Sequence, residues 1–398
     1  MKSLPSLDAA IGSSSVLQPK EVTSAMYILT LSASHNKLDY AAYAATGQPL
    51  WSGHVTLQHP DLSVDEAIEV ALDALQRNWS EQHLRKAPDV IGLRVVFGGT
   101  SFVEPTFATD ETLARLAKLS PQAPLHLPPT IAVARGVRRR FSNVPLVLLF
   151  ETAFFANLPW REQSYGLDPD LADPEELRRY GYHGLFHGAA CAALARQLRE
   201  KREIRQPRIQ SLCLEPNPEL VSLDDGRPLV VTSGATPLEG LPGDTSAGEV
   251  DPAIILDLAK TAKLGPEAIN QLLTRESGLT GLVGHPTTLE LVLKQDEPED
   301  RFALELFEHR LLLAVGAGIA ALGGLDGIVV SGRYAKAGAS IGSRLVARLS
   351  ALPGLRTVPP ELLIFPARRD RLIADQTMAV AAIVRAPALQ LARVGSLQ

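Results

Sequence analysis

The chain has 398 residues, of which 45% are apolar and 21% charged, so it is long enough for two domains with sizeable cores. Its 39 lysines and arginines and 44 acidic residues give a formal net charge of −5 without a basic stripe, which argues against duplex nucleic acid as a partner. The two cysteines, Cys191 and Cys213, exclude a disulfide framework and favour a reducing compartment. We therefore expect a cytoplasmic protein.

Residues 1–25 lack the apolar run of a signal-peptide core, so we predict a disordered N-terminal extension there. The longest uncharged apolar run, residues 311–325, is 15 residues long, whereas a membrane-spanning helix needs roughly 20. This run predicts a buried helix, and we expect no membrane partner.

The first half of the chain predicts an α/β arrangement. Polar and apolar residues alternate over 26–57, which is typical of a three-stranded antiparallel meander. Apolar positions three and four apart predict a helix over 64–86, and an apolar strand follows at 89–99. A helix over 110–119 and a proline-rich passage then lead to a second apolar strand at 144–150. Strands separated by helices indicate a largely parallel sheet.

The second half repeats this order. Residues 209–234 again predict strand, turn, strand, turn and strand. The later pattern predicts helices over 251–262, 265–275, 300–322 and 339–350, strands at 327–332 and 361–366, and a final helix near 371–386 that packs back on the first half. The repeated order predicts duplicated α/β architecture with a ligand cleft between the two halves.

Four stretches, in the same order, resemble the acetate kinase family. They are Arg179-Tyr-Gly-Tyr-His-Gly-Leu-Phe-His187, Thr236-Pro-Leu-Glu-Gly-Leu241, Gly248-Glu-Val-Asp-Pro-Ala-Ile-Ile255 and Phe150-Glu-Thr-Ala-Phe154. This resemblance implies the duplicated actin-like, ribonuclease H-like fold of the acetate and sugar kinase, Hsc70 and actin superfamily. It implies an N-terminal domain of residues 26–153 plus 374–398 and a C-terminal domain of residues 154–373.

The resemblance also implies an activity. Members of the family transfer the γ-phosphoryl group of ATP to acetate or propionate, with Mg²⁺ bridging the phosphates, and they are usually homodimers. We therefore expect a short-chain carboxylate or acyl phosphate as ligand, Mg²⁺ and ATP as cofactors if the protein is active, and a homodimer. Such a transfer depends on positive charge and backbone amides placed around the moving phosphoryl group.

The matched motifs assign roles to particular residues. The catalytic positions fall on Arg94, His183, Glu151 and Lys37, and the apolar acyl pocket falls on Val96, Leu125, Tyr182 and Pro237. The nucleotide-binding positions fall on Asn217 and Gly332, and the metal-binding carboxylates on Glu151 and Asp370.

Several family positions are altered in this chain. The family's second arginine falls on Ser246, and no lysine or arginine lies between Gly234 and Lys260 to replace it. Its glycine-rich phosphate turn falls on residues 215–219, Glu-Pro-Asn-Pro-Glu, where prolines remove amide donors and two carboxylates should repel a phosphate. We therefore hold two hypotheses: an acetate kinase-like phosphotransferase with much reduced or lost activity, or a non-catalytic relative that binds a small acid, an acyl phosphate or a protein partner.

Structural interpretations stand beside these roles. Arg94 is equally explained as a paired structural arginine and His183 as a structural histidine in a tight turn, while Glu239 and Asp251 suit interdomain hydrogen bonding and helix capping. His183 and His187 have the four-residue spacing of metal ligands, but apolar residues separate them and no carboxylate is close in sequence. We therefore predict no zinc site there.

Overall fold

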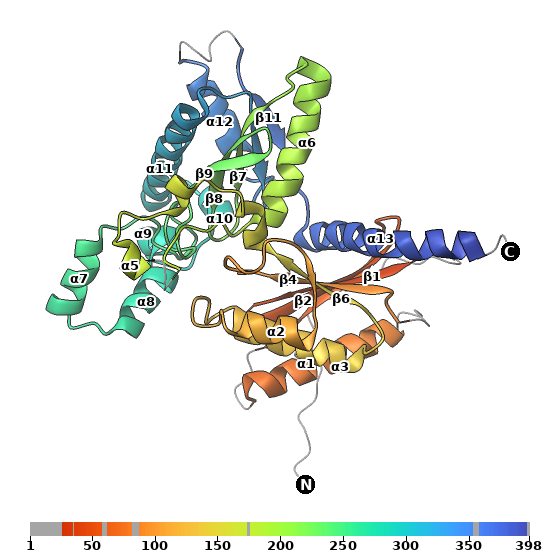
Figure 1. The fold of residues 1–398 in the computed structure, drawn as a ribbon. Coiled ribbons are helices and arrows are strands. Elements are labelled where there is room, and N and C mark those ends of the chain that lie inside the picture. Colours follow the sequence, from red (N-terminus) through yellow and green to blue (C-terminus); the bar gives the residue numbers. More distant parts are fainter. Residues whose placement is uncertain are drawn as a thin grey trace. The chain divides into compact units, whose positions relative to one another are not determined.

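The structure is a computed structural model that describes residues 26–34, 36–57, 62–81, 87–172, 176–352 and 358–395. The predicted extension over residues 1–25 lies outside this range. The chain divides into two compact units (Figure 1). Unit 1 contains the described residues up to Ala153 and those from Arg369 onward, and unit 2 is Phe154–Arg368.

Unit 1 is built on a six-stranded sheet with the order β3-β2-β1-β4-β6-β5. The predicted antiparallel meander is confirmed, because β1 (Tyr27–Ala33) pairs with β2 (Lys37–Ala44), which pairs with β3 (Pro49–Thr56). The predicted parallel part is confirmed in β1, β4 (Val90–Val95) and β6 (Leu146–Phe150). The short β5 (Thr106–Phe107) closes one edge antiparallel to β6.

Helices cover both faces of this sheet. Three of them, α1 (Val64–Glu81), α2 (Asp110–Ala117) and α3 (Leu127–Arg140), lie on one side, and α13 (Arg369–Gly395) lies on the other (Figure 1). Gly92 on β4 allows α13 to approach closely, since a Cβ there would lie 2.0 Å from Thr377 Oγ1. The prediction that the final helix packs on the first half is therefore confirmed.

Helix α3 was not predicted, because it begins inside the proline-rich passage. Its first turn contains Pro128 and Pro129. Proline is tolerated at the start of a helix, where an N–H has no partner within the helix. The prolines that suggested a loop therefore mark the beginning of a helix.

Unit 2 repeats the sheet order of unit 1. Its five strands follow the order β11-β10-β7-β8-β9. An antiparallel meander of β7 (Arg208–Cys213), β8 (Glu219–Asp224) and β9 (Arg227–Val231) joins the parallel strands β10 (Gly327–Ser331) and β11 (Glu361–Ile364) through β7. This repetition confirms the predicted duplication.

The sheet of unit 2 is also covered on both faces. Val329 packs in the cluster with α6 (Gly184–Arg202), whereas its neighbours Ile328 and Val330 pack with α11 (Pro298–Leu322) and α12 (Ala339–Leu349), as the two-residue period of a strand requires. The remaining elements are α4 (Trp160–Gln163), α5 (Pro169–Ala172), α7 (Pro252–Thr261), α8 (Pro266–Arg275), α9 (Gly278–Val283), α10 (Leu289–Val292) and a 3₁₀ turn at Glu151–Phe155. No helix in the described parts of the chain is long and apolar enough to cross a membrane.

Candidate functional site

The sequence-predicted residues of unit 1 gather at the carboxyl edge of its parallel strands. Arg94 is the fifth residue of β4 and pairs in register with Ser32 near the end of β1. Glu151 directly follows β6, and Lys37 begins β2 at the same end of the sheet. In α/β sheets, ligands bind outside the carboxyl ends of the strands. The topology therefore places three predicted catalytic residues at one functional edge.

Arg94 and Glu151 form a buried ion pair. The guanidinium Nε donates to Glu151 Oε1, and the glutamate side chain is fully buried. Beside it, the hydroxyl of Thr152 accepts a 2.9 Å hydrogen bond from the Gly98 amide. Arg94 is thus paired, which does not decide between its structural and its ligand-binding interpretation, and one oxygen of the predicted metal carboxylate is already engaged.

The other predicted residues of unit 1 differ in their surroundings. Lys37 Nζ donates a 3.0 Å hydrogen bond to Asp39 on the same strand. Val96 is buried after β4, but the side chain of Leu125 is 46% exposed in the turn before α3. Asp370 lies in the first turn of α13.

In unit 2, a buried carboxylate binds the two backbone amides that directly precede α6. The two oxygens of Glu219 accept hydrogen bonds from the amide of Tyr182 at 3.0 and 3.2 Å, and Oε1 accepts another from the amide of His183 at 3.2 Å. His187 Nε2 donates to the same Oε1 at 3.1 Å. The N-terminus of a helix attracts an anion through its amides and dipole. Here the anion is supplied by the chain itself.

This arrangement shifts the pKa of two side chains. Burial disfavours the charge of Glu219, but the hydrogen bond from His187 and the nearby imidazoles hold the pKa of Glu219 below its usual value of 4.5. Burial and the Glu219 charge raise the pKa of Tyr182 well above 10. The Glu219 carboxylate is therefore charged and the Tyr182 phenol is neutral. The phenol donates a hydrogen bond to the carbonyl of Ala235, which lies two residues before the half-buried Pro237.

The loop over residues 215–219 is held by three further contacts. His183 Nε2 lies 2.8 Å from the Asn217 carbonyl oxygen, and Ser246 donates a 2.8 Å hydrogen bond to Asn217 Oδ1. Glu215 Oε1 accepts a 2.7 Å hydrogen bond from the Arg333 amide. We expected the carboxylates of this loop to repel a phosphate, but Glu215 and Glu219 are both buried and engaged. Both carboxylates are buried and occupy donors, and their repulsion of a phosphate stays a prediction.

Gly332 directly follows β10, at the carboxyl end of that strand. Its φ is +89°, and a Cβ would lie 2.5 Å from the Leu214 carbonyl oxygen, so the position requires glycine. Close by in sequence, the hydroxyl of Tyr334 donates a 2.6 Å hydrogen bond to the buried Asp244. Burial raises the pKa of both Asp244 and Tyr334. Sequence reasoning missed this pair, because nothing in the spacing links two residues 90 positions apart.

Two motif residues act as structural groups. Asp251 caps α7 by accepting a 2.8 Å hydrogen bond from the Ala253 amide, which confirms the capping interpretation. Glu239 forms an ion pair with Arg179 and accepts a hydrogen bond from the Tyr165 hydroxyl; both partners lie in unit 2, so these contacts are not the interdomain ones that were expected. His187, besides contacting Glu219, lies 2.8 Å from Ser211 Oγ through Nδ1. Within the described ranges, no group of three or more His, Cys, Asp or Glu side chains is arranged to hold a metal ion.

The repeated sheet order and the positions of these residues at strand ends define a duplicated, actin-like fold of the kind found in small-molecule kinases. A propionate kinase structure from Francisella tularensis superposes with a TM-score of 0.76 at 22% identity, covering 89% of this chain and 99% of that one. An acetate kinase structure from Porphyromonas gingivalis gives a TM-score of 0.74 at 20% identity, covering 89% and 100%. At these identities the likeness establishes the fold.

Sequence comparison specifies the family. The Acetokinase family model matches residues 51–387. The acetate kinase of Leifsonia xyli subsp. xyli is 34% identical over 319 residues, or 74% of this chain and 79% of that protein. The acetate kinase of Clavibacter michiganensis subsp. michiganensis is 35% identical over 321 residues, with the same coverage. The chain belongs to the acetokinase family, which confirms the resemblance read from its motifs.

Proposed function

We propose that this protein is an acetate kinase-like phosphotransferase for acetate, propionate or another short carboxylate whose exchange of a phosphoryl group with ATP is strongly reduced or lost. One observation carries the proposal. Glu219 accepts hydrogen bonds from the Tyr182 and His183 amides, and Glu215 accepts one from the Arg333 amide. Donors that would face a phosphate therefore already have anionic partners.

The magnitude of the change supports this proposal. Loss of one donor to a developing oxyanion lowers a rate about 10² to 10³-fold. In this chain the loop also contains Pro216 and Pro218, which have no N–H, and Ser246 supplies a hydroxyl at the position of the family's second arginine. In unit 2 the amides of Tyr182, His183 and Arg333 already have carboxylate partners, and in unit 1 Arg94 engages one oxygen of Glu151, which weighs against tight binding of ATP and Mg²⁺.

A second candidate function is non-catalytic binding of a small carboxylate or acyl phosphate, with a protein-partner scaffold as its variant. It is supported by the features of unit 1 that remain intact. Arg94 stands at the carboxyl end of β4 beside the buried Val96, and these are the family's positions for the carboxylate and the acyl group. A carboxylate ligand at this place would compete with Glu151 for the guanidinium of Arg94.

The activity is tested in the favourable direction. Purified protein is mixed with acetyl or propionyl phosphate, ADP and Mg²⁺, and ATP formation is followed beside the Leifsonia xyli acetate kinase. We expect ATP formation at least 10²-fold slower than that of the relative. A rate within tenfold of the relative, abolished by His183→Ala, would refute the proposal. The second candidate would be favoured if acetyl phosphate raises the melting temperature of a protein that forms no ATP. This stabilisation should be lost in Arg94→Gln and kept in Lys37→Gln.

A triple variant tests the cause of the expected loss. Glu215→Gly and Glu219→Ser free the occupied amides, and Ser246→Arg supplies the missing charge. We expect ATP formation to rise at least tenfold in the folded triple variant. An unchanged rate in a variant with a native circular dichroism spectrum would show that these carboxylates are not what limits transfer.

We also propose a cytoplasmic homodimer. Both cysteines are free and buried, which supports a reducing compartment. Helix α7 buries none of its residues within the chain, and its side chains Ile254 and Leu256 are 52% and 71% exposed. An apolar helix face of this kind suits a second copy of the chain. Light scattering after size exclusion should give the dimer mass, and Leu256→Lys should give the monomer mass without unfolding; a wild-type monomer would contradict the proposal.

A further inference from the structure

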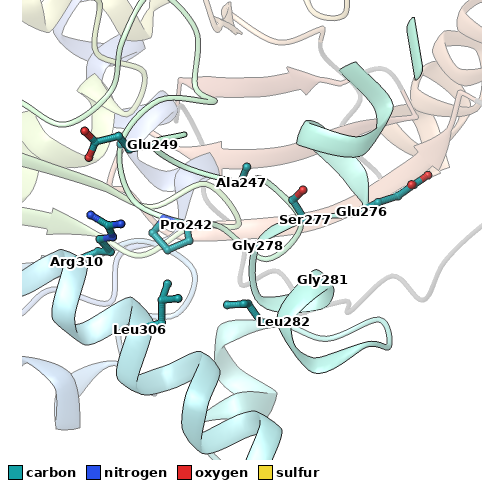
Figure 2. A pocket seen from close by; sticks show the side chains of 11 residues that line it. Pro242, Ala247, Glu249, Glu276, Ser277, Gly278, Gly281, Leu282, Leu306 and Arg310 are labelled. Carbon is teal, nitrogen blue, oxygen red and sulfur yellow. The ribbon is translucent and has the colours of Figure 1, made fainter. Parts of the chain in front are cut away.

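A pocket of about 380 Å³ lies in unit 2, and none of its lining residues is one that the motifs match to the family's catalytic, acyl, nucleotide or metal positions (Figure 2). It is bounded by the loop over residues 240–249, by α9 and by α11. The pocket volume is left open by the small size of four of its lining residues, Gly240, Ala247, Gly278 and Gly281. The volume falls within the range of about 300–1,000 Å³ that is typical of small-molecule sites.

A second hollow of about 290 Å³ adjoins this pocket. The two share Gly240, Glu249 and Arg310, so they form one groove along α11 with both charged residues in its wall. The second hollow adds apolar lining from Leu313 and Ala314 of α11, and it is also lined by Arg179 and Glu239, which form an ion pair with each other. The groove therefore combines apolar walls with charges of both signs.

Arg310 and Glu249 are exposed in this groove and do not pair with each other. Within the described ranges, neither side chain makes an ion pair within 4.0 Å or a side-chain hydrogen bond. Other arginines of unit 2 are paired, among them Arg301 with Asp296 and Arg344 with Glu308. A guanidinium and a carboxylate on the same wall, each open to the groove, offer two complementary contacts to a single ligand.

The pocket wall next to these two charged residues includes apolar side chains. Figure 2 shows Glu249 and Arg310 together at one end, with Leu306 and Leu282 along the adjoining wall. The third charged residue, Glu276, points away from this pair in the same view and accepts a 3.2 Å hydrogen bond from Gln271. The local charge that faces a ligand beside the two leucines is therefore one positive and one negative group.

We propose that this pocket binds a free α-amino acid with a short aliphatic side chain. Its carboxylate contacts Arg310, its ammonium group contacts Glu249, and its side chain packs against Leu282 and Leu306. A simple carboxylate would leave Glu249 beside a second negative charge, and a simple amine would leave Arg310 beside a second positive one. Only a zwitterion satisfies both groups, and the leucines favour an aliphatic side chain over a polar one.

Isothermal titration calorimetry of the full chain with L-leucine tests the proposal. We expect saturable binding at one site per chain, weakened at least tenfold by Arg310→Gln and by Glu249→Gln. Isovalerate, which lacks the ammonium group, and isopentylamine, which lacks the carboxylate, should each bind at least tenfold more weakly than L-leucine. The matched control is Arg348→Gln, which removes an exposed arginine of α12 outside the groove and should leave binding unchanged.

Three results would overturn the proposal. They are an absence of saturable heat with millimolar L-leucine, equal binding by wild type and Arg310→Gln, and equal binding of isovalerate and L-leucine. Both substituted side chains are exposed, so the variants should keep the wild-type circular dichroism spectrum and melting temperature. Phosphoryl transfer is not read in this experiment, and its outcome is independent of the proposed function.

Discussion

Replacing Glu219 with alanine removes an acceptor shared by three buried donors: the amides of Tyr182 and His183 and the imidazole of His187. Each buried donor left without an acceptor costs about 1–3 kcal/mol, so three such donors together lower stability by about 3–5 kcal/mol. We expect a loss of that size in the free energy of unfolding of unit 2. Glu219→Gln keeps the shape and one acceptor oxygen, so its loss should be nearer the ~1–3 kcal/mol of an unsatisfied buried donor.

The same contact predicts a pH dependence. Because the pKa of Glu219 is lower in the folded protein than its usual 4.5, the unfolded chain binds the proton more readily. The stabilisation is therefore fully present above pH 4.5 and decreases as the pH falls through the folded pKa. The difference in free energy of unfolding between wild type and Glu219→Ala should shrink on acidification below pH 4.5. The contribution of Glu219 to this difference should stay constant from pH 6 to 8.

Urea unfolding, followed by hydrogen exchange of the α6 amides, measures these losses in unit 2. The matched control is Glu200→Ala, which removes an exposed carboxylate from the same helix and should change stability by less than about 0.5 kcal/mol. If Glu219→Ala loses no more than Glu200→Ala, or if its deficit grows on acidification, the assigned role of Glu219 is wrong.

Two further predictions concern unit 1. Arg94→Gln breaks the buried ion pair with Glu151 and should lower the free energy of unfolding by about 3–5 kcal/mol, whereas the double variant with Glu151→Gln should recover part of the loss; additive losses in urea unfolding would contradict the pairing. Gly92→Ala forces a methyl group to within 2.0 Å of Thr377 Oγ1 and should lower stability by about 1–3 kcal/mol. Thr377→Ala should relieve this loss, and an unchanged melting temperature in the single variant would rule out the close approach.

Much of the fold could be predicted because the strands carry local signals. Alternation identified both meanders, and the apolar runs at 144–150 and 327–332 identified strands buried on both faces. The misses lie where one residue type has two meanings. Pro128 and Pro129 suggested a loop but begin α3, whereas the predicted end of the first helix, residue 86, lies outside the described residues.

For the candidate site, the sequence predicted where the residues lie along the chain but not which groups they contact. Motif matching located Arg94, Glu151 and His183, but it could not supply their partners, since a contact such as that between Glu215 and Arg333 joins residues 118 positions apart. The direction in which a carboxylate points depends on the donors that the fold brings to it. For this reason the sequence located Glu219 but could not predict that it binds the amides of Tyr182 and His183.

The return of the chain to unit 1 has a consequence for biosynthesis. Ile373, Ala374 and Thr377 of α13 are buried in unit 1, yet the ribosome makes them only after all of Phe154–Arg368. At about 5–20 residues per second, this interval is on the order of 10–40 s. During it, the apolar face around Gly92 lacks its cover from α13, because unit 2 is still being synthesised. The nascent first unit is therefore the part of this protein most in need of a chaperone.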